Sequence, residues 1–175
     1  GRMALDEHGL GGRVGRYTIS RTVTDRLQRF NGLASTPLYH PPLLAPHLAP
    51  GMLVTLRGEL GAGKTTLVRG LLRALGHAGR VKSPTYALVE VYEVSRLNFY
   101  HFDFYRFHDP SEWIDAGFRD VFNGRNICLI EWPERAGGQL PPADLEIALE
   151  TREPGRLATL AALSPAGERL LAALP

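Results

Sequence analysis

Cysteine is almost absent from this chain of 175 residues, because the only one is Cys128, which lies inside an apolar run. A single cysteine excludes a disulfide framework and a cysteine-based metal site within one chain. We therefore expect a buried, reduced thiol of the kind found in cytosolic proteins.

Long hydrophobic runs and export signals are also missing. No apolar stretch approaches the roughly 20 residues that a helix needs to cross a bilayer. The start, Gly1-Arg2-Met3, is polar and does not have the pattern of a signal peptide. The length, the 44% hydrophobic content and the 22% charged content are those of a one-domain globular protein. We expect a soluble cytoplasmic protein with no membrane partner.

Lysine is scarce as well. Arginine supplies most of the positive charge, and the only lysines are Lys64 and Lys82. The net charge of +2 is only mildly basic, so it permits contact with RNA without arguing for it. Both lysines fall within motifs described below, which makes a chemical role for Lys64 more credible than chance placement.

One glycine-rich stretch carries the clearest chemistry. It reads Gly58-Glu59-Leu60-Gly61-Ala62-Gly63-Lys64-Thr65, followed by Thr66, which is the G-x-x-x-x-G-K-T pattern of a phosphate-binding loop (P-loop). In such a loop the backbone N–H groups point at phosphate oxygens, the lysine reaches the β- and γ-phosphates and the threonine hydroxyl binds Mg²⁺. The stretch predicts a site for ATP or ADP with Mg²⁺.

The flanks of this loop support the prediction over a chance match. The apolar run 52–56 indicates a buried strand over 52–57, and leucines recur every four residues from Leu67. That spacing predicts a helix over 64–75, which Gly76 ends. A strand, a glycine loop and a helix N-terminus in this order form an anion site.

The rest of the chain alternates between strand and helix patterns. Strands are predicted over 87–92, 98–105, 126–131, 145–151 and 157–163, and helices over 109–122 and from Ser164 onward. The pattern predicts an α/β fold, a three-layer P-loop NTPase with a mostly parallel central sheet flanked by helices. We assign residues 51–175 to this ATPase domain.

Residues 1–50 give a weaker signal. Glycines dominate the first part and prolines the last, so we expect an irregular N-terminal arm that belongs in part to the same domain. Within the arm, residues 17–20 favour a short strand, and residues 22–30 fit a short helix or a strand.

Two carboxylates are candidates for the second half of the site. Glu131 ends the apolar run 127–131, and the carboxyl ends of parallel strands face the ligand crevice. It is a Walker-B-type candidate for Mg²⁺, although an ordinary surface glutamate fits the pattern too. Asp103 lies inside an aromatic strand, where a charge needs a partner or a metal. It is either functional or paired with an arginine such as Arg106.

Other polar positions leave more than one interpretation open. Ser83 and Thr85 follow Lys82 in a polar loop that either senses the γ-phosphate or is a plain solvated turn. Trp132 either lines the nucleotide pocket or packs in the core. His101 and His108 show no zinc spacing, and structural roles are expected for both.

Four motifs occur in an order that is specific to one family. They are Gly58–Thr66, Val81–Tyr86, His101–Arg106 and Leu129–Glu134. With this order and spacing, the chain resembles the bacterial TsaE family, also called YjeE, over about residues 51–172. The segment before the P-loop strand departs from the family pattern, because residues 31–50 are longer and rich in proline.

The resemblance implies a function. Members of the family are the ATPase subunits of threonylcarbamoyladenosine synthesis at adenosine 37 of tRNA, where they act with TsaB and TsaD. It implies slow hydrolysis of ATP by the subunit alone, faster hydrolysis with the partners, contact with tRNA that is indirect or weak, and a possible monomer when free. Carried onto this chain, Lys64 binds phosphates and Thr65 and Glu131 hold Mg²⁺. Asp103 supports hydrolysis, Ser83 and Thr85 belong to a switch loop, and Trp132 lies near the nucleotide.

Three other function classes are compatible with a phosphate-binding loop. A stand-alone P-loop kinase for a small molecule is the main alternative, but it should carry an arginine-rich lid, and only Arg119 and Arg125 fall in a suitable region. A GTP-dependent switch lacks the Asn-Lys-x-Asp motif that reads guanine. A nucleotide-sensing adaptor with incidental hydrolysis needs no further motif.

Overall fold

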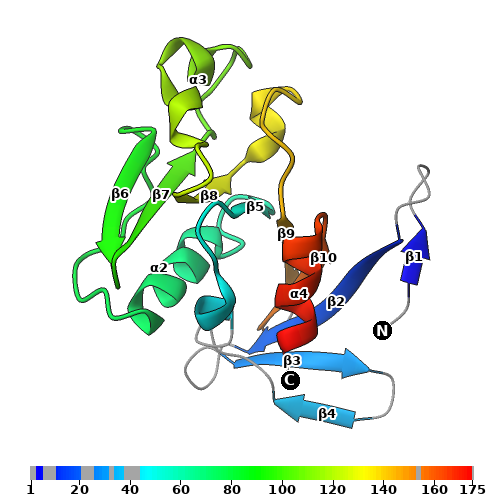
Figure 1. Ribbon diagram of the computed structural model, residues 1–175. Coiled ribbons are helices and arrows are strands. Elements are labelled where there is room, and N and C mark those ends of the chain that lie inside the picture. Colours follow the sequence, from blue (N-terminus) through cyan, green and yellow to red (C-terminus); the bar gives the residue numbers. More distant parts are fainter. Residues whose placement is uncertain are drawn as a thin grey trace.

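The computed structural model describes residues 3–5, 11–20, 26–31, 34–37, 44–152 and 155–174. Its centre is a sheet in which six successive strands lie in the order β10-β9-β5-β8-β7-β6, with β6 at one edge (Figure 1). These strands are β5 (Leu53–Arg57), β6 (Val89–Val94), β7 (Leu97–Asp103), β8 (Ile127–Glu131), β9 (Leu145–Arg152) and β10 (Gly155–Ala162).

The inner strands of this sheet run parallel and the outer ones turn back. Parallel pairs join β7 to β8, β8 to β5 and β5 to β9, while β6–β7 and β9–β10 are antiparallel hairpins. The predicted α/β fold with a mostly parallel central sheet is confirmed. Because the inner strands point the same way, the carboxyl ends of β5, β7 and β8 meet at one edge.

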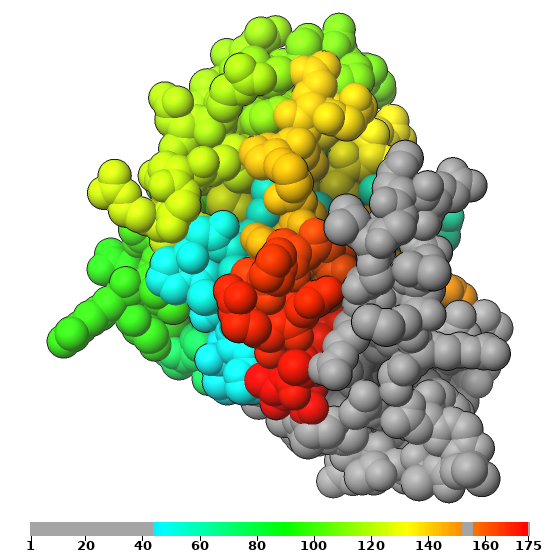
Figure 2. All heavy atoms as spheres, turned by 45° about the vertical axis from the view of Figure 1, so that its right-hand side comes forward, coloured from blue at the N-terminus to red at the C-terminus, as the bar shows by residue number. Residues whose placement is uncertain are grey.

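Helices cover both faces of the sheet. One face packs against η1 (Ala45–His47), α2 (Lys64–Ala74) and α4 (Pro165–Ala173), and the shared core includes Val68, Phe99 and Leu129. In Figure 2 the red α4 lies beside the cyan segment that begins at Leu44. The other face packs against α3 (Glu112–Asp115), η2 (Phe118–Val121) and η3 (Pro133–Ala136), around Trp113 and Ile130. Alternate residues of β8 therefore enter different cores.

The helix after the P-loop ends as predicted. Gly76 adopts the left-handed region at φ 101°, its N–H donates to the Arg73 carbonyl, and the His77 N–H donates to the Leu72 carbonyl. These two bonds form the Schellman motif that glycine favours.

The predicted helix over 109–122 is wrong in its continuity. The structure has the four residues of α3, then Gly117 at φ 78°, then the 3₁₀ turn η2. A left-handed residue cannot continue a right-handed helix, so the segment turns there. Strand ends also differ: β6 starts after Leu88, which has a φ of 66°, and β7 stops at Asp103.

The N-terminal part is more regular than its composition predicts. Its described residues form β1 (Met3–Leu5), β2 (Gly11–Ser20), β3 (Arg26–Asn31) and β4 (Ala34–Pro37), and β2 pairs with β10. The expectation of an irregular arm is wrong for these strands, and the short strand predicted at 17–20 is confirmed. The remaining residues up to 43 lie outside the described part, and the domain division remains a prediction. The edge of β10 offers unpaired backbone groups, which β2 satisfies.

None of the described helices has the length and apolar character required to cross a membrane.

Candidate functional site

A pocket of about 320 Å³ opens where the parallel strands end. Its walls come from four segments that are far apart in the sequence: the P-loop, the 83–85 loop, the end of β7 and the end of β8. The lining residues are Leu60, Gly61, Gly63, Lys64, Thr65, Thr66, Ser83, Thr85, Asp103, Tyr105, Glu131 and Trp132. The fold therefore brings the separate predicted motifs to one place.

Glycine is required at several points of the P-loop backbone. Gly58 has a φ of 145°, and a Cβ there would lie 2.6 Å from the Leu149 carbonyl oxygen. Gly63 has a φ of 108° and leads directly into α2, whose first turn presents backbone N–H groups that have no partner within the helix. Positive φ costs little only for glycine. The loop and the N-terminus of α2 together form a cradle for an anion.

Lys64 is held inside this cradle. Its Nζ donates to the carbonyl oxygens of Gly58 at 2.5 Å and Glu59 at 3.0 Å, and it lies 4.1 Å from the centre of the Trp132 ring. Burial lowers the pKa of the Lys64 ammonium, and the nearby carboxylates, Glu131 foremost, oppose that shift. The side chain is a cation at the base of the pocket, 4% exposed.

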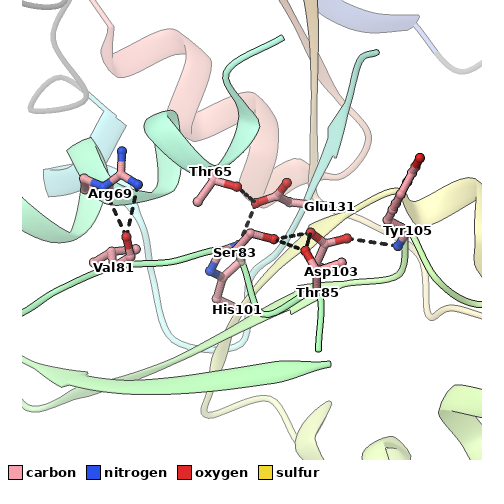
Figure 3. A network of polar contacts seen from close by, with 9 residues as sticks. All are labelled: Thr65, Arg69, Val81, Ser83, Thr85, His101, Asp103, Tyr105 and Glu131. Atoms are coloured by element: carbon pink, nitrogen blue, oxygen red, sulfur yellow. Dashed lines mark hydrogen bonds and ion pairs between the residues drawn. The ribbon is translucent and has the colours of Figure 1, made fainter. Parts of the chain in front are cut away.

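Thr65 and Glu131 meet across the pocket floor (Figure 3). The Thr65 hydroxyl donates to Glu131 Oε1 at 2.7 Å, and His101 Nε2 lies 2.8 Å from the same oxygen. Both hydrogen bonds that the Glu131 carboxylate accepts in the described structure go to Oε1, so Oε2 is left for another ligand. Glu131 is 3% exposed and His101 is fully buried.

Asp103 stands beside Glu131, in register with it on the neighbouring strand. It accepts hydrogen bonds from the Ser83 hydroxyl, from the Thr85 hydroxyl at 3.1 Å and from the Tyr105 backbone N–H at 2.9 Å. The two hydroxyls are 2.7 Å apart. Figure 3 shows this cluster next to the Thr65–Glu131 pair. The 83–85 loop is therefore tied to the carboxylate.

The pairing of Asp103 with Arg106 is not observed in the described structure. Arg106 instead stacks on the ring of Tyr86, at 4.2 Å from its centre, and Tyr86 is 84% exposed. The start of the loop is anchored separately, because Arg69 on α2 donates from two nitrogens to the Val81 carbonyl at 3.2 and 3.1 Å.

Trp132 lies in the pocket wall rather than in the core alone. It follows Glu131 with a φ of 58°, and its ring centre is 5.0 Å from that of Tyr105. The two rings are tilted by 48° to each other, and with Lys64 they line one side of the pocket.

Some predicted contact residues shape the loop instead of lining the pocket. Gly58 packs against Leu149, the Glu59 carbonyl accepts hydrogen bonds from Lys64 and from the Ala62 N–H, and the Ala62 methyl is buried. None of these three residues is among those that line the pocket.

Three residues at or next to the site carry no clear functional signal in the sequence. Tyr105 lines the pocket, and its place in the aromatic run 98–105 could have drawn attention to it. His101 contacts Glu131, although it was assigned an ordinary structural role. Arg156 donates from Nε to the Ala62 carbonyl at 3.1 Å, and no local signal connects these two positions, which are 94 residues apart.

The oxygen donors of the pocket suit Mg²⁺. Thr65 offers a hydroxyl and Glu131 a carboxylate oxygen, which are the hard ligands that this ion prefers. In the part of the chain that the structure describes, no cluster of three or more histidine, cysteine or acidic side chains could hold a metal ion. Mg²⁺ usually takes one or two protein ligands and completes its shell with water and phosphate.

Comparisons with known proteins give a consistent result. The family model "Threonylcarbamoyl adenosine biosynthesis protein TsaE" matches residues 41–158. A tRNA threonylcarbamoyladenosine biosynthesis protein TsaE from Haemophilus influenzae is 47% identical over 131 residues, which cover 75% of this chain and 83% of that protein. A protein of the same name from Bacillus subtilis is 41% identical over 108 residues, covering 62% and 67%. The crystal structure of Bacillus subtilis YdiB has the same fold, with a TM-score of 0.64, 32% identity and coverage of 75% and 82%.

Proposed function

The chain belongs to the TsaE family of threonylcarbamoyl adenosine biosynthesis proteins, and on that basis we propose that it binds and hydrolyses ATP as a subunit of the machinery that forms threonylcarbamoyladenosine in tRNA. The observation that carries the proposal is one pocket in which a P-loop lysine, a hydroxyl–carboxylate pair and a second carboxylate converge.

The P-loop residues bind the polyphosphate in this proposal. Backbone N–H groups of the loop and of the first turn of α2, such as those of Gly63 and Thr65, would donate to phosphate oxygens. Lys64 would exchange its contacts with the Gly58 and Glu59 carbonyls for the β- and γ-phosphates. Because Lys64 lies at the base of the pocket, its ammonium group needs only a small movement to make this exchange. Trp132 and Tyr105 supply an aromatic wall beside it.

Thr65 and Glu131 would hold Mg²⁺, either directly or through water. An ion held there would supply positive charge to the β- and γ-phosphate oxygens. The Thr65 hydroxyl donates its proton to Glu131, which leaves the lone pairs of its oxygen available to a cation.

Asp103 would orient the attacking water or the 83–85 loop. Its two carboxylate oxygens accept from three donors, which fixes the orientation of the group next to Glu131. Ser83 and Thr85 then link the position of this carboxylate to the γ-phosphate, as in a switch loop that ligand contacts order.

Biosynthesis of the modified nucleoside implies work with other proteins of the same process. We propose partners of the TsaB and TsaD type, contact with tRNA that is indirect or weak, and a free monomer in the cytoplasm. The kinase alternative finds no favouring feature, because in the described part no arginine lines the pocket to act as a lid.

The test measures ATP turnover by the protein alone, with TsaB and TsaD, and with both partners and tRNA. We expect slow hydrolysis alone and an increase with the partners, since the resemblance implies regulated turnover. The Lys64→Ala variant should lose about 10- to 100-fold in ATP affinity, which is the worth of one or two hydrogen bonds from a charged donor. A turnover rate indifferent to the partners, or a small metabolite that emerges phosphorylated, would contradict the proposal.

A further inference from the structure

The proposed function leaves two of the described buried polar side chains unused, Thr55 and His101, and of these two His101 contacts a residue of the site. It lies on β7, two residues before Asp103, and its side chain has no exposed surface. A polar ring in a core costs free energy unless its hydrogen bonds are made. The neighbouring inward position on the same face is Phe99, so an apolar side chain would suit this core.

Only one nitrogen of the His101 ring makes a hydrogen bond within the described residues. His101 Nε2 lies 2.8 Å from Glu131 Oε1, and a carboxylate only accepts, so the proton of this pair belongs to Nε2. Within the described residues, Nδ1 has no hydrogen-bond partner. Glu131 is therefore the only polar contact of the ring among the described residues. This hydrogen bond offsets the free-energy cost of burying a histidine at this position.

The strand register explains how the contact with His101 sets the orientation of the Glu131 carboxylate. His101 pairs with Leu129 and Asp103 pairs with Glu131 on the parallel strands β7 and β8. The imidazole thus approaches Glu131 diagonally from the core side, while the Thr65 hydroxyl approaches the same oxygen from α2. Two donors on Oε1 fix the rotation of the carboxylate and leave Oε2 turned away from both.

We propose that His101 is a positioning residue that fixes the Glu131 carboxylate for Mg²⁺ in the nucleotide complex. This inference rests on the proposed function, because it assigns the metal role to Glu131. Partners that orient a metal ligand in this way typically contribute a factor of about 10 to 100 in metal affinity. His101 acts through Glu131 and touches neither the nucleotide nor the metal.

The experiment measures ADP binding by calorimetry with and without MgCl₂, and the readout is the ratio of the two dissociation constants. We expect His101→Leu to keep metal-free ADP affinity and to lose about 10-fold or more of the gain that Mg²⁺ gives to the wild type. His101→Gln should recover part of that gain, because its Nε2 amide can still donate. The matched control is Phe99→Leu on the same strand and face, which should lower the melting temperature and keep the full gain.

The outcomes separate this inference from the proposed function. A wild type that binds no ADP, or gains nothing from Mg²⁺, would refute the proposed site itself. A His101→Leu protein with the full gain would overturn the positioning role alone. If that variant does not fold, ¹⁵N spectra of the histidines in the wild type decide: adding Mg²⁺ to the ADP complex should shift the His101 ring signals, identified by their loss in His101→Gln, and unchanged signals would overturn the role.

Discussion

Substitution of Asp103 should separate ATP binding from ATP hydrolysis. It is 3% exposed, and its oxygens are held by two hydroxyls and one backbone N–H. We expect Asp103→Asn to lower ATP turnover by about 100-fold or more, the usual worth of a positioned carboxylate in general acid–base catalysis. ATP affinity should change little, because Asn keeps the size of the side chain and one acceptor oxygen. Single-turnover hydrolysis and calorimetry on the same variant check both parts.

A matched control for this substitution is Asp109→Asn. Asp109 is exposed and caps the neighbouring Ser111, away from the residues that line the pocket. Its replacement should leave turnover unchanged. If Asp103→Asn also hydrolyses ATP at the wild-type rate, the carboxylate has a structural role only.

The helix α4 depends on a close backbone approach at Gly167. A Cβ at this position would lie 1.9 Å from the Asp144 carbonyl oxygen. Asp144 also accepts from the Leu53 N–H at 2.9 Å and from the Ser164 hydroxyl at 2.5 Å, so it joins β5, β9 and α4. Anything that pushes Asp144 away therefore disturbs the strand that precedes the P-loop.

We expect Gly167→Ala to lower the free energy of unfolding by about 1–3 kcal/mol, as overpacking does. Helix propensity alone predicts the opposite sign, a gain of about 1 kcal/mol. Urea unfolding measures the difference, and exposed Ala172→Gly in the same helix serves as the control for propensity. A Gly167→Ala protein more stable than the wild type would show that α4 shifts without cost.

Elements with strong local signals could be predicted from the sequence. The period of four after Lys64 and the glycine at position 76 predicted α2 and its end, and the apolar run before Glu131 predicted β8. Serine 164 followed by proline predicted the start of α4, where the Ser164 hydroxyl accepts from the Gly167 N–H. The break at Gly117 was missed because an isolated glycine is also tolerated within helices.

The site was predictable in its residue types but not in its contacts. Lysine, threonine and two strand-end carboxylates indicated their chemistry one motif at a time. That His101 and Thr65 share one oxygen of Glu131 depends on the register of β7 and β8 and on the position of α2. Register is a property of paired strands, so a single strand's sequence does not contain it.

The molecule as a whole should lose stability in alkaline solution through Cys128. Burial raises the pKa of its thiol from the ordinary value of 9.0 to about 12. Above pH 9 the unfolded chain releases this proton while the folded chain keeps it, so the folded state binds more protons and its stability falls as pH rises. The contribution is complete below pH 9 and is lost toward pH 12, at up to about 1.4 kcal/mol per pH unit.

The measurement is the free energy of unfolding of the wild type and of Cys128→Ala at pH 8, 9 and 10. Burial raises the pKa of Tyr92 as well, so the wild type and the variant share that background slope. The difference between the two proteins should shrink as the pH rises. Parallel lines would indicate that the thiol is reached by solvent in the folded protein.

The sheet as a whole extends further than local patterns indicated. The N-terminal strand β2 adds to β10, whose sequence partner in the hairpin is β9. Glycines and prolines in residues 1–50 favoured irregular chain, whereas the pairing depends on an available sheet edge more than 100 residues away. Long-range pairing of this kind overrides weak local preference.

The backbone conformation at Trp132 allows two consecutive residues, Glu131 and Trp132, to line the same pocket. Side chains next to each other in a strand face opposite ways, so Glu131 and its successor would normally serve different sides of the sheet. The left-handed φ of 58° reverses that order and turns the indole toward Lys64. Glycine would adopt this conformation at less cost, by about 1–3 kcal/mol, but would remove the ring. At position 132 the backbone conformation therefore favours glycine, whereas the pocket wall requires the indole ring.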